Sequence, residues 1–93
     1  MPESENKSEN RRKKLRFRSW HRGTREMDLL LGRFADRHIQ TLSDGELDQF
    51  SAVLRCPDQD LYDWVTGKLP WPQPLQNALT QRLTRFSTDQ TSC

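Results

Sequence analysis

Apolar residues recur at intervals of three and four in the segment that begins at Met27, and this spacing most constrains what the chain can fold into. On an α-helix, residues three and four apart lie on the same face, whereas a half-buried β-strand would require strict alternation. The apolar stripe consists of Met27, Leu30, Leu31, Phe34 and either His38 or Ile39. The pattern therefore predicts an amphipathic helix over about residues 24–40.

Two further helices are indicated downstream. Ser43 and Glu46 have the spacing of a capping box, in which each side chain bonds to the backbone of the other residue. This box would open a helix that must end before Pro57, because the residue preceding a proline disfavours the helical conformation. Its apolar stripe is Leu47, Phe50, Val53 and Leu54. A short helix over about residues 58–66 follows, with acidic residues in its first turn and Gly67 as its stop.

Three prolines shape the segment before the last helix. Pro70, Pro72 and Pro74 should hold residues 68–74 extended, since each ring fixes its own torsion and restricts the residue before it. Trp71 lies between them, where it would be either a lid over the core or a surface anchor. The final helix is predicted from a stripe with helical spacing, formed by Leu75, Leu79, Leu83 and Phe86.

The N-terminal part is less apolar. Residues 10–20 predict a short basic helix, with Lys13, Phe17 and Trp20 on one side and Leu15 off that side. Together with the segments above, this helix predicts an all-α fold, a compact single-domain bundle of about five short helices joined by short connections.

Both ends of the chain lack an apolar stripe that could dock on a core. We therefore expect residues 1–9 to form a disordered N-terminal arm and residues 88–93 to form a frayed tail. Residues 10–87 would then be the helical-bundle domain.

Charge is distributed unevenly along the chain. Residues 1–25 hold nine Lys or Arg and three Glu, a net charge of +6, whereas the rest holds six basic and ten acidic residues, a net charge of −4. A basic N-terminal region of this kind could meet nucleic acid, an anionic membrane or an acidic protein surface. For the basic cluster taken alone, a solvated helix is the favoured interpretation.

Membrane insertion and targeting find no support in the sequence. No run approaches the roughly 20 apolar residues needed to span a bilayer. The first ten residues carry three Glu and no apolar core, unlike a secretory signal or an acid-poor transit peptide. We expect a protein that stays where it is made or has already been processed.

The chemistry-bearing residues do not form a recognisable catalytic or metal site. Cys56 and Cys93 lack metal-type spacing and suit a reducing compartment without a structural disulfide. His21 and His38 lack acidic or thiol neighbours at ligand spacing, so no metal site is expected. A phosphate-binding glycine loop and a nucleophile with its base are both missing from the sequence, so we expect a protein that is not an enzyme.

One short stretch breaks a local rule. Gly23 would be a tolerated N-cap with Glu26 in the first helical turn, but Arg22 and Arg25 place positive charge at the positive end of the helix dipole. Arg22 also precedes Glu26 in the weaker orientation of a helical ion pair. Because these positive charges oppose the helix dipole without any visible stabilising gain, they indicate a partner outside the chain.

These residues also carry a family resemblance. The Arg-Gly-x-x-Glu pattern at residues 22–26, the continuation MDLLLGRFA at residues 27–35 and the block PDQDLYDWVTG at residues 57–67 occur in this order. Together they resemble the succinate dehydrogenase flavinylation and assembly factor family, over roughly residues 11–87. The resemblance implies a five-helix fold.

The resemblance also implies a function. Family members assist the covalent attachment of FAD to the flavoprotein subunit of succinate dehydrogenase and, in some bacteria, of fumarate reductase. The histidyl linkage is made in the partner, so the helper would supply geometry and hold no stably bound cofactor of its own. Which residues, if any, contact FAD is left open.

The implied partner-binding residues are Arg22, Gly23, Glu26 and Asp28. Arg22 would pair with a carboxylate of the partner, Gly23 would permit close backbone approach and Glu26 would accept a hydrogen bond. Thr24 departs from the apolar residue that many members carry, which puts only a packing detail of the interface in doubt.

The expected partner is thus a flavoprotein subunit, met by a factor that is monomeric when free. The compartment would be the bacterial cytoplasm, or the mitochondrial matrix for a processed eukaryotic member. The alternative is a small basic nucleic-acid-binding module, for which Phe17 and Trp20 are the candidate stacking residues. No helix-turn-helix or RNA-platform pattern accompanies them, so specific nucleic-acid binding is not expected.

Overall fold

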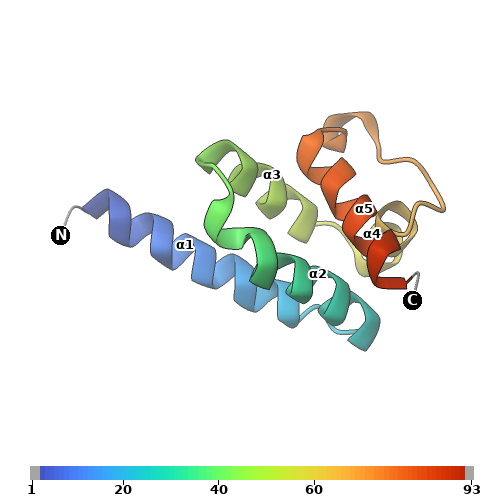
Figure 1. The fold of residues 1–93 in the computed structure, drawn as a ribbon, viewed down its shortest axis with the longest axis horizontal. Helices are drawn as coiled ribbons and strands as arrows, with labels where there is room; N and C mark the ends of the chain where they lie inside the picture. Colours follow the sequence, from blue (N-terminus) through green and yellow to red (C-terminus); the bar gives the residue numbers. More distant parts are fainter. Residues whose placement is uncertain (1–2, 92–93) are drawn as a thin grey trace.

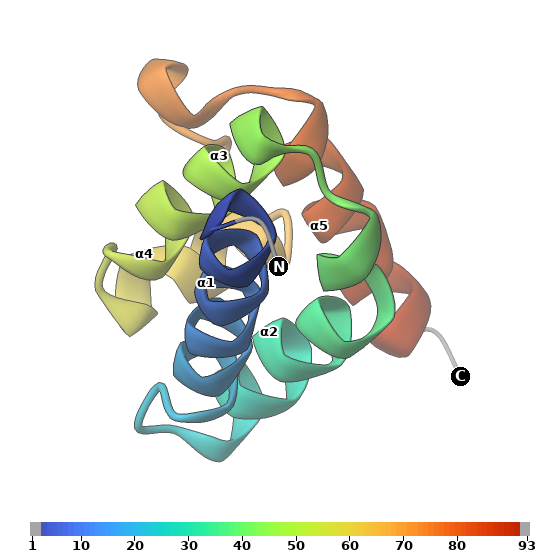
Figure 2. The ribbon, with the colours of Figure 1, turned by 90° about the vertical axis from the view of Figure 1, so that its left-hand side faces the viewer.

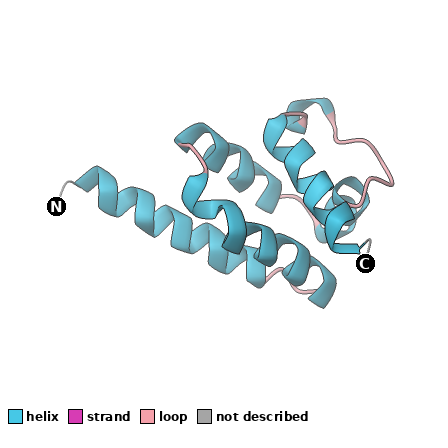
Figure 3. Cartoon of the chain, in the orientation of Figure 1, coloured by secondary structure: helices cyan, strands magenta, loops and turns pink. Residues whose placement is uncertain are grey.

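The computed structural model describes residues 3–91, and within that range it is all-α, as predicted (Figures 1 and 3). Its helices are α1 (Glu3–Trp20), α2 (Arg25–His38), α3 (Asp44–Leu54), α4 (Asp58–Val65) and α5 (Ala78–Thr91). Two 3₁₀ turns, Ile39–Thr41 and Gln73–Leu75, lie in the connections. No helix in the described part of the chain is both long and apolar enough to cross a membrane.

The helices enclose one core. α1 and α2 lie side by side and run in opposite directions, and α1 also contacts α3 (Figures 1 and 2). On the other side, α5 contacts α2, α3 and α4 and thereby closes the bundle. The N-terminal half of the chain therefore supplies a helical hairpin, and the C-terminal half packs across it.

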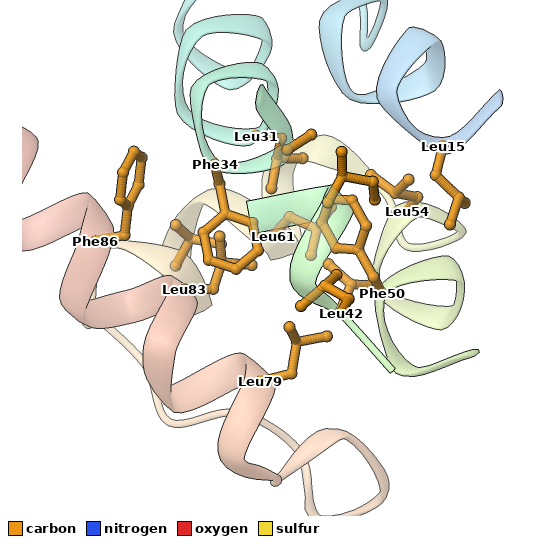
Figure 4. Close-up of a cluster of buried hydrophobic side chains, with 14 of the residues drawn as sticks. Leu15, Leu31, Phe34, Leu42, Phe50, Leu54, Leu61, Leu79, Leu83 and Phe86 are labelled. Atoms are coloured by element: carbon orange, nitrogen blue, oxygen red, sulfur yellow. The ribbon is translucent and has the colours of Figure 1, made fainter. Parts of the chain in front are cut away.

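Aromatic rings form the centre of the core (Figure 4). Phe34 and Phe50 are fully buried, with ring centroids 5.6 Å apart, and Phe86 meets Phe34 edge-on at the same distance. Leucine side chains from α2, α3, α4 and α5 fill the space around them, including Leu31, Leu47, Leu61, Leu79 and Leu83. The predicted stripes of α2 and α3 are confirmed, except that Leu30 is only partly buried at the margin.

Several predicted boundaries are confirmed by hydrogen bonds. The Ser43 hydroxyl accepts from the Glu46 N–H at 3.2 Å, and the Glu46 carboxylate accepts from the Ser43 N–H at 2.9 Å, which is the predicted capping box. These bonds hold the pKa of Glu46 below its usual value. Gly67 follows α4 with φ +83°, a left-handed conformation that suits glycine at a helix stop.

The last helix begins later than its apolar stripe predicts. Leu75 lies in a 3₁₀ turn, and α5 starts at Ala78. Asn77 and Thr80 bond reciprocally: the Thr80 N–H donates to Asn77 Oδ1 at 2.9 Å, and the Asn77 N–H donates to Thr80 Oγ1 at 3.1 Å. Because this pairing satisfies N–H groups of the first turn, it sets the start of the helix where the apolar spacing alone could not.

α1 differs from its prediction in length and in orientation. It begins at Glu3 rather than at about residue 10, so residues 3–9, expected in a disordered arm, are helical; extending a helix that already exists costs little per residue. The predicted grouping of residues does not follow burial, since Leu15, placed off the side of Phe17, is buried and Phe17 is 62% exposed. Leu15 and the buried Ser19, one turn apart, form the inward face, and Ser19 satisfies its hydroxyl by donating to the Leu15 carbonyl at 2.7 Å.

The C-terminal tail also differs. α5 continues to Thr91, and Thr88, expected to fray, donates through its hydroxyl to the Thr84 carbonyl at 3.1 Å. The predicted tail extends to Cys93, which lies outside the described residues. Whether residues 10–87 form a domain separable from both ends stays a prediction.

Trp71 is a lid over the core rather than a surface anchor. Its side chain is 9% exposed, and its indole N–H donates to Thr84 Oγ1 on α5 at 2.8 Å. The ring lies 5.7 Å from that of Trp64. The proline-flanked segment thus folds back on the bundle and covers it.

Close contact between α1 and α2 depends on a glycine. The Trp20 indole lies directly over Gly32, where a Cβ atom would come within 2.2 Å of the ring. The indole N–H donates to Asp36 Oδ1 at 3.1 Å, which fixes the ring in place. The Trp20 ring therefore occupies the space that any other residue at position 32 would need.

We predict that Gly32→Ala destabilises the protein. Alanine would gain up to about 1 kcal/mol from helix propensity, but overpacking against a fixed ring costs about 1–3 kcal/mol and should dominate. Gly45→Ala on α3 is the matched control, because a Cβ there meets only Ser43 Oγ at 4.0 Å. The free energies of unfolding of both variants are measured by denaturant unfolding. If Gly32→Ala were as stable as Gly45→Ala, the close packing of Trp20 on Gly32 would be contradicted.

Candidate functional site

The turn between α1 and α2 carries the Arg-Gly-x-x-Glu pattern. Gly23 adopts φ +115°, a backbone conformation that residues with a side chain rarely adopt. An added Cβ would meet only Asp58 Oδ2, at an ordinary 3.8 Å. The requirement for glycine here is therefore set by the backbone torsion and not by lack of space.

Thr24, and not Gly23, is the N-cap of α2. Its backbone is extended, and its hydroxyl accepts from the Met27 N–H at 3.3 Å. Threonine can form this bond and glycine cannot, so the predicted Gly23 cap is wrong. Thr24 therefore has a clear local role in starting the helix.

The Arg22 side chain turns inward and is only 11% exposed. Its Nε donates to Asp58 Oδ1 at 2.8 Å, one terminal nitrogen donates to the Leu54 carbonyl, and the other donates to the Cys56 carbonyl at 2.5 Å. Leu54 is the last residue of α3, where carbonyls lack partners within the helix, and Asp58 opens α4. One guanidinium therefore joins the α1–α2 turn to the end of α3 and the start of α4.

Asp28 reinforces the same turn from within α2. Its carboxylate accepts from the Arg22 backbone N–H at 2.6 Å. The local sequence shows no compensation for the charge of Arg22, because its bonding partners lie 32 to 36 residues further along the chain. Whether Arg22 and Asp28 also touch a partner stays a prediction.

Glu26 is the member of the pattern that the fold leaves exposed. It does not pair with Arg22, whose guanidinium is bonded to Asp58. Together with Thr24 and Met27 it borders an open pocket of about 460 Å³, whose other wall is α4. The α4 residues that line the pocket are Asp58, Gln59, Tyr62 and Asp63.

This pocket is acidic. Glu26, Asp58 and Asp63 contribute carboxylates, and within the described part of the chain Asp58 alone of the three forms a salt bridge, to Arg22. Such a surface suits a cationic or hydrogen-bond-donating group of another molecule. The geometry thus groups Gly23, Thr24 and Glu26 at the surface, while Arg22 and Asp28 support them from below.

Neighbouring groups of possible chemical interest have structural roles. Burial raises the pKa of the Cys56 thiol, and this outweighs the opposing charge of Arg22, so the thiol is kept from ionising. His21 stacks on Phe17 with ring centroids 4.0 Å apart, and its Nδ1 lies 2.7 Å from the Phe17 carbonyl. Among the described residues, no group of three His, Cys, Asp or Glu could hold a metal ion.

Known proteins resemble the chain over most of its length. Residues 13–87 match the family described as "Flavinator of succinate dehydrogenase". A protein of Acetobacter pasteurianus named "FAD assembly factor SdhE" is 38% identical over 77 residues, which cover 83% of this chain and 71% of that protein.

Mitochondrial proteins are similar as well. Two of them are named "Succinate dehydrogenase assembly factor 2, mitochondrial". The protein of Meyerozyma guilliermondii is 45% identical over 58 residues, and that of Danio rerio is 33% identical over 79 residues. The matches cover 62% and 83% of this chain, respectively. The chain spans 43% and 50% of the length of these two relatives, so about half of each has no counterpart in the match.

We predict that Arg22→Ala lowers the free energy of unfolding by about 2–3 kcal/mol. The variant leaves Asp58 and the carbonyl groups at the end of α3 without their partner, and the partial exposure of the pair keeps the cost below that of a fully buried one. Arg25→Ala, which removes the same charge from an exposed position, should change stability by less than about 0.5 kcal/mol. Equal effects on the thermal midpoint would show that Arg22 does not join these elements.

Proposed function

Because this chain belongs to the family of flavinators of succinate dehydrogenase, we propose that it is an assembly factor that binds the flavoprotein subunit of that enzyme and promotes covalent attachment of FAD to it. The family match over residues 13–87, which includes the whole Arg22 turn and the acidic pocket, carries this proposal. In a bacterium that has fumarate reductase, its flavoprotein is a second candidate partner.

The proposed factor acts by orientation. A bound factor that holds the partner's histidine close to the flavin lowers an orientational cost that can reach roughly 7–11 kcal/mol in favourable intramolecular systems. It can do so only by binding the productive conformation of the partner better than other conformations. FAD would be the partner's cofactor, and the factor itself would hold none stably.

The frame around Glu26 suits such a role. Glu26 lies in the first turn of α2, whose start is fixed by the Thr24 cap and by the bonds of Arg22 and Asp28. A contact residue held in place before binding loses little entropy on association, so more of its interaction energy favours the complex. We infer that Glu26 accepts from a cationic or polar group of the partner and that Gly23 lets the partner approach the backbone.

On this proposal Arg22 and Asp28 position the contact residues. Both are engaged within the chain, and a partner would have to compete with Asp58 for the Arg22 guanidinium. The raised pKa of the Cys56 thiol disfavours a thiolate at this position. The chemical step would then belong entirely to the partner.

A monomeric state when free is part of the proposal. Among the described side chains, only Phe17 and Leu69 are large, apolar and exposed, too few to form an extended self-association surface. The proposed site of action is the bacterial cytoplasm or the mitochondrial matrix, and the relatives include a protein of a bacterium and proteins named as mitochondrial.

The structure weakens the alternative of a nucleic-acid-binding module. One face of the Trp20 ring packs on Gly32 and the residue is only partly exposed, so Phe17 is the more exposed of the two candidate stacking residues. Arg11 and Arg16 pair with Asp48 and Asp36 of the same chain. The basic helix is therefore partly committed to holding the fold together.

We predict that Glu26→Gln slows covalent flavin incorporation by at least about tenfold, which corresponds to the loss of one hydrogen bond to a charged group. Its thermal midpoint should stay close to that of the unchanged protein, because the Glu26 side chain is exposed. The measurement is flavin fluorescence of the denatured flavoprotein subunit after co-expression. Gly23 substitutions are less informative, since the positive φ strains them.

Asp44→Asn is the matched control, since Asp44 is an exposed carboxylate in the first turn of α3, away from the pocket. It removes the same charge and should leave flavin incorporation unchanged. Full flavin incorporation with Glu26→Gln would refute the assigned contact. If the unchanged protein did not increase flavin incorporation over that measured without it, the proposed function would be refuted.

A further inference from the structure

A second charged surface lies where α2 and α5 meet. Four arginines gather there, and we call this surface the α2–α5 basic face: Arg33, Arg37, His38, Arg82, Arg85 and Phe86. Two open pockets of about 310 Å³ each lie on it, and they adjoin because both are lined by Arg37 and Phe86. None of these residues belongs to the Arg22 turn or to the acidic pocket.

Helical spacing and one aromatic contact bring the arginines together. Arg33 and Arg37 are one turn apart on α2, and Arg82 and Arg85 are one turn apart on α5. The two helices meet through the core rings Phe34 and Phe86, which Figure 4 shows next to each other. The core packing therefore places the positive charges of both helices on one surface.

Part of this charge has no partner among the described residues, although Arg33 does have one. Within residues 3–91, the exposed Arg37 and Arg85 side chains form no hydrogen bond or salt bridge. Arg82 reaches Glu46 at 3.4 Å, but both side chains are substantially exposed, so the pair contributes little. The carboxylate of Asp36, which borders one pocket, is already paired with Arg16 at 2.6 Å.

The pKa of His38 is affected by the arginines of this face. Its ring lies 4.7 Å from the Phe34 ring and 5.9 Å from the Phe86 ring. Burial lowers the pKa of His38, and the positive charges of Arg82 and Arg37 lower it further. The positive charges of Arg82 and Arg37 thus act on His38, although Asp36 and Asp89 also line the two pockets.

We propose that the α2–α5 basic face is a docking surface for an acidic peptide segment of a protein partner. Guanidinium groups bind carboxylates through paired hydrogen bonds, and several arginines over two shallow, adjoining pockets suit an extended segment better than a compact ligand. Asp36 and Asp89 line the same pockets and would oppose any polyanion, so a nucleic acid is the competing occupant that the test must distinguish.

This surface is distinct from the site assigned to flavoprotein binding. Glu26 and Arg37 are separated by about 16 Å along the axis of α2, at a rise of about 1.5 Å per residue. An acidic segment could therefore bind without touching the Arg22 turn. The inference does not depend on the proposed function, and either can fail without the other.

The test uses the full chain and an end-blocked hexaglutamate peptide as the probe, followed by NMR at low salt. The bound peptide should offset the charges of Arg37 and Arg82, so the pKa of His38 should rise when the peptide is added. His21, the other histidine of the chain, is the internal control, and its imidazole signals should not respond. Binding should weaken as salt is raised.

Paired variants locate the site. Arg37→Gln with Arg85→Gln should weaken peptide binding by at least about tenfold, since both charge-assisted contacts are lost. Lys13→Gln with Lys14→Gln removes the same charge from exposed positions on α1 and should weaken it by less than about twofold. All four positions are exposed, and thermal melting confirms that each variant is folded.

Two results would overturn the proposal. If both pairs of variants weakened binding equally, the peptide would be responding to overall charge and not to this face. If a single-stranded oligothymidylate displaced the peptide and bound more tightly at the same salt concentration, the face would be a nucleic-acid site. Tenfold selective loss together with the rise in the pKa of His38 would establish the docking surface.

Discussion

The Arg22 guanidinium is the interaction on which the rest of the arrangement depends. It bonds to Asp58 at the start of α4 and to carbonyls at the end of α3, while its own backbone N–H is held by Asp28. Arginine is suited to this position because its planar group donates in several directions at once. Lysine could neutralise Asp58 but could not also reach both carbonyls in the same plane. The α1–α2 turn is thereby fixed relative to α4, and the acidic pocket between them has a defined shape.

The same pattern of residues therefore serves stability and recognition. Arg22 and Asp28 hold the turn, Gly23 provides its left-handed backbone, and Thr24 starts the helix that presents Glu26. Loss of activity after a change at Arg22 would reflect a displaced turn as much as a lost contact. Glu26 is different, since its exposed carboxylate forms no salt bridge in the part of the chain that the structure describes. This division explains how a chain with a small core can keep a rigid contact surface.

Local patterns in the sequence predicted the elements well. The apolar spacing of α2, the capping box of α3 and the Gly67 stop all depend on residues close in sequence, and all are confirmed. The partners of Arg22 could not be predicted, because they lie in another part of the chain. The contact of Trp20 with Gly32 was missed for the same reason, although a glycine inside an apolar helix is a signal of close packing. The buried face of α1 could not be predicted, because a helix with so few apolar residues gives no clear periodicity.

Hydrogen exchange of the chain, alone and bound to the flavoprotein subunit lacking FAD, tests the central claim most directly. The account predicts slower exchange of amides in residues 23–28 and 58–63, the two walls of the acidic pocket, because the partner would cover both. Unchanged exchange in these segments, with protection confined to the outer face of α1 around Phe17, would contradict it.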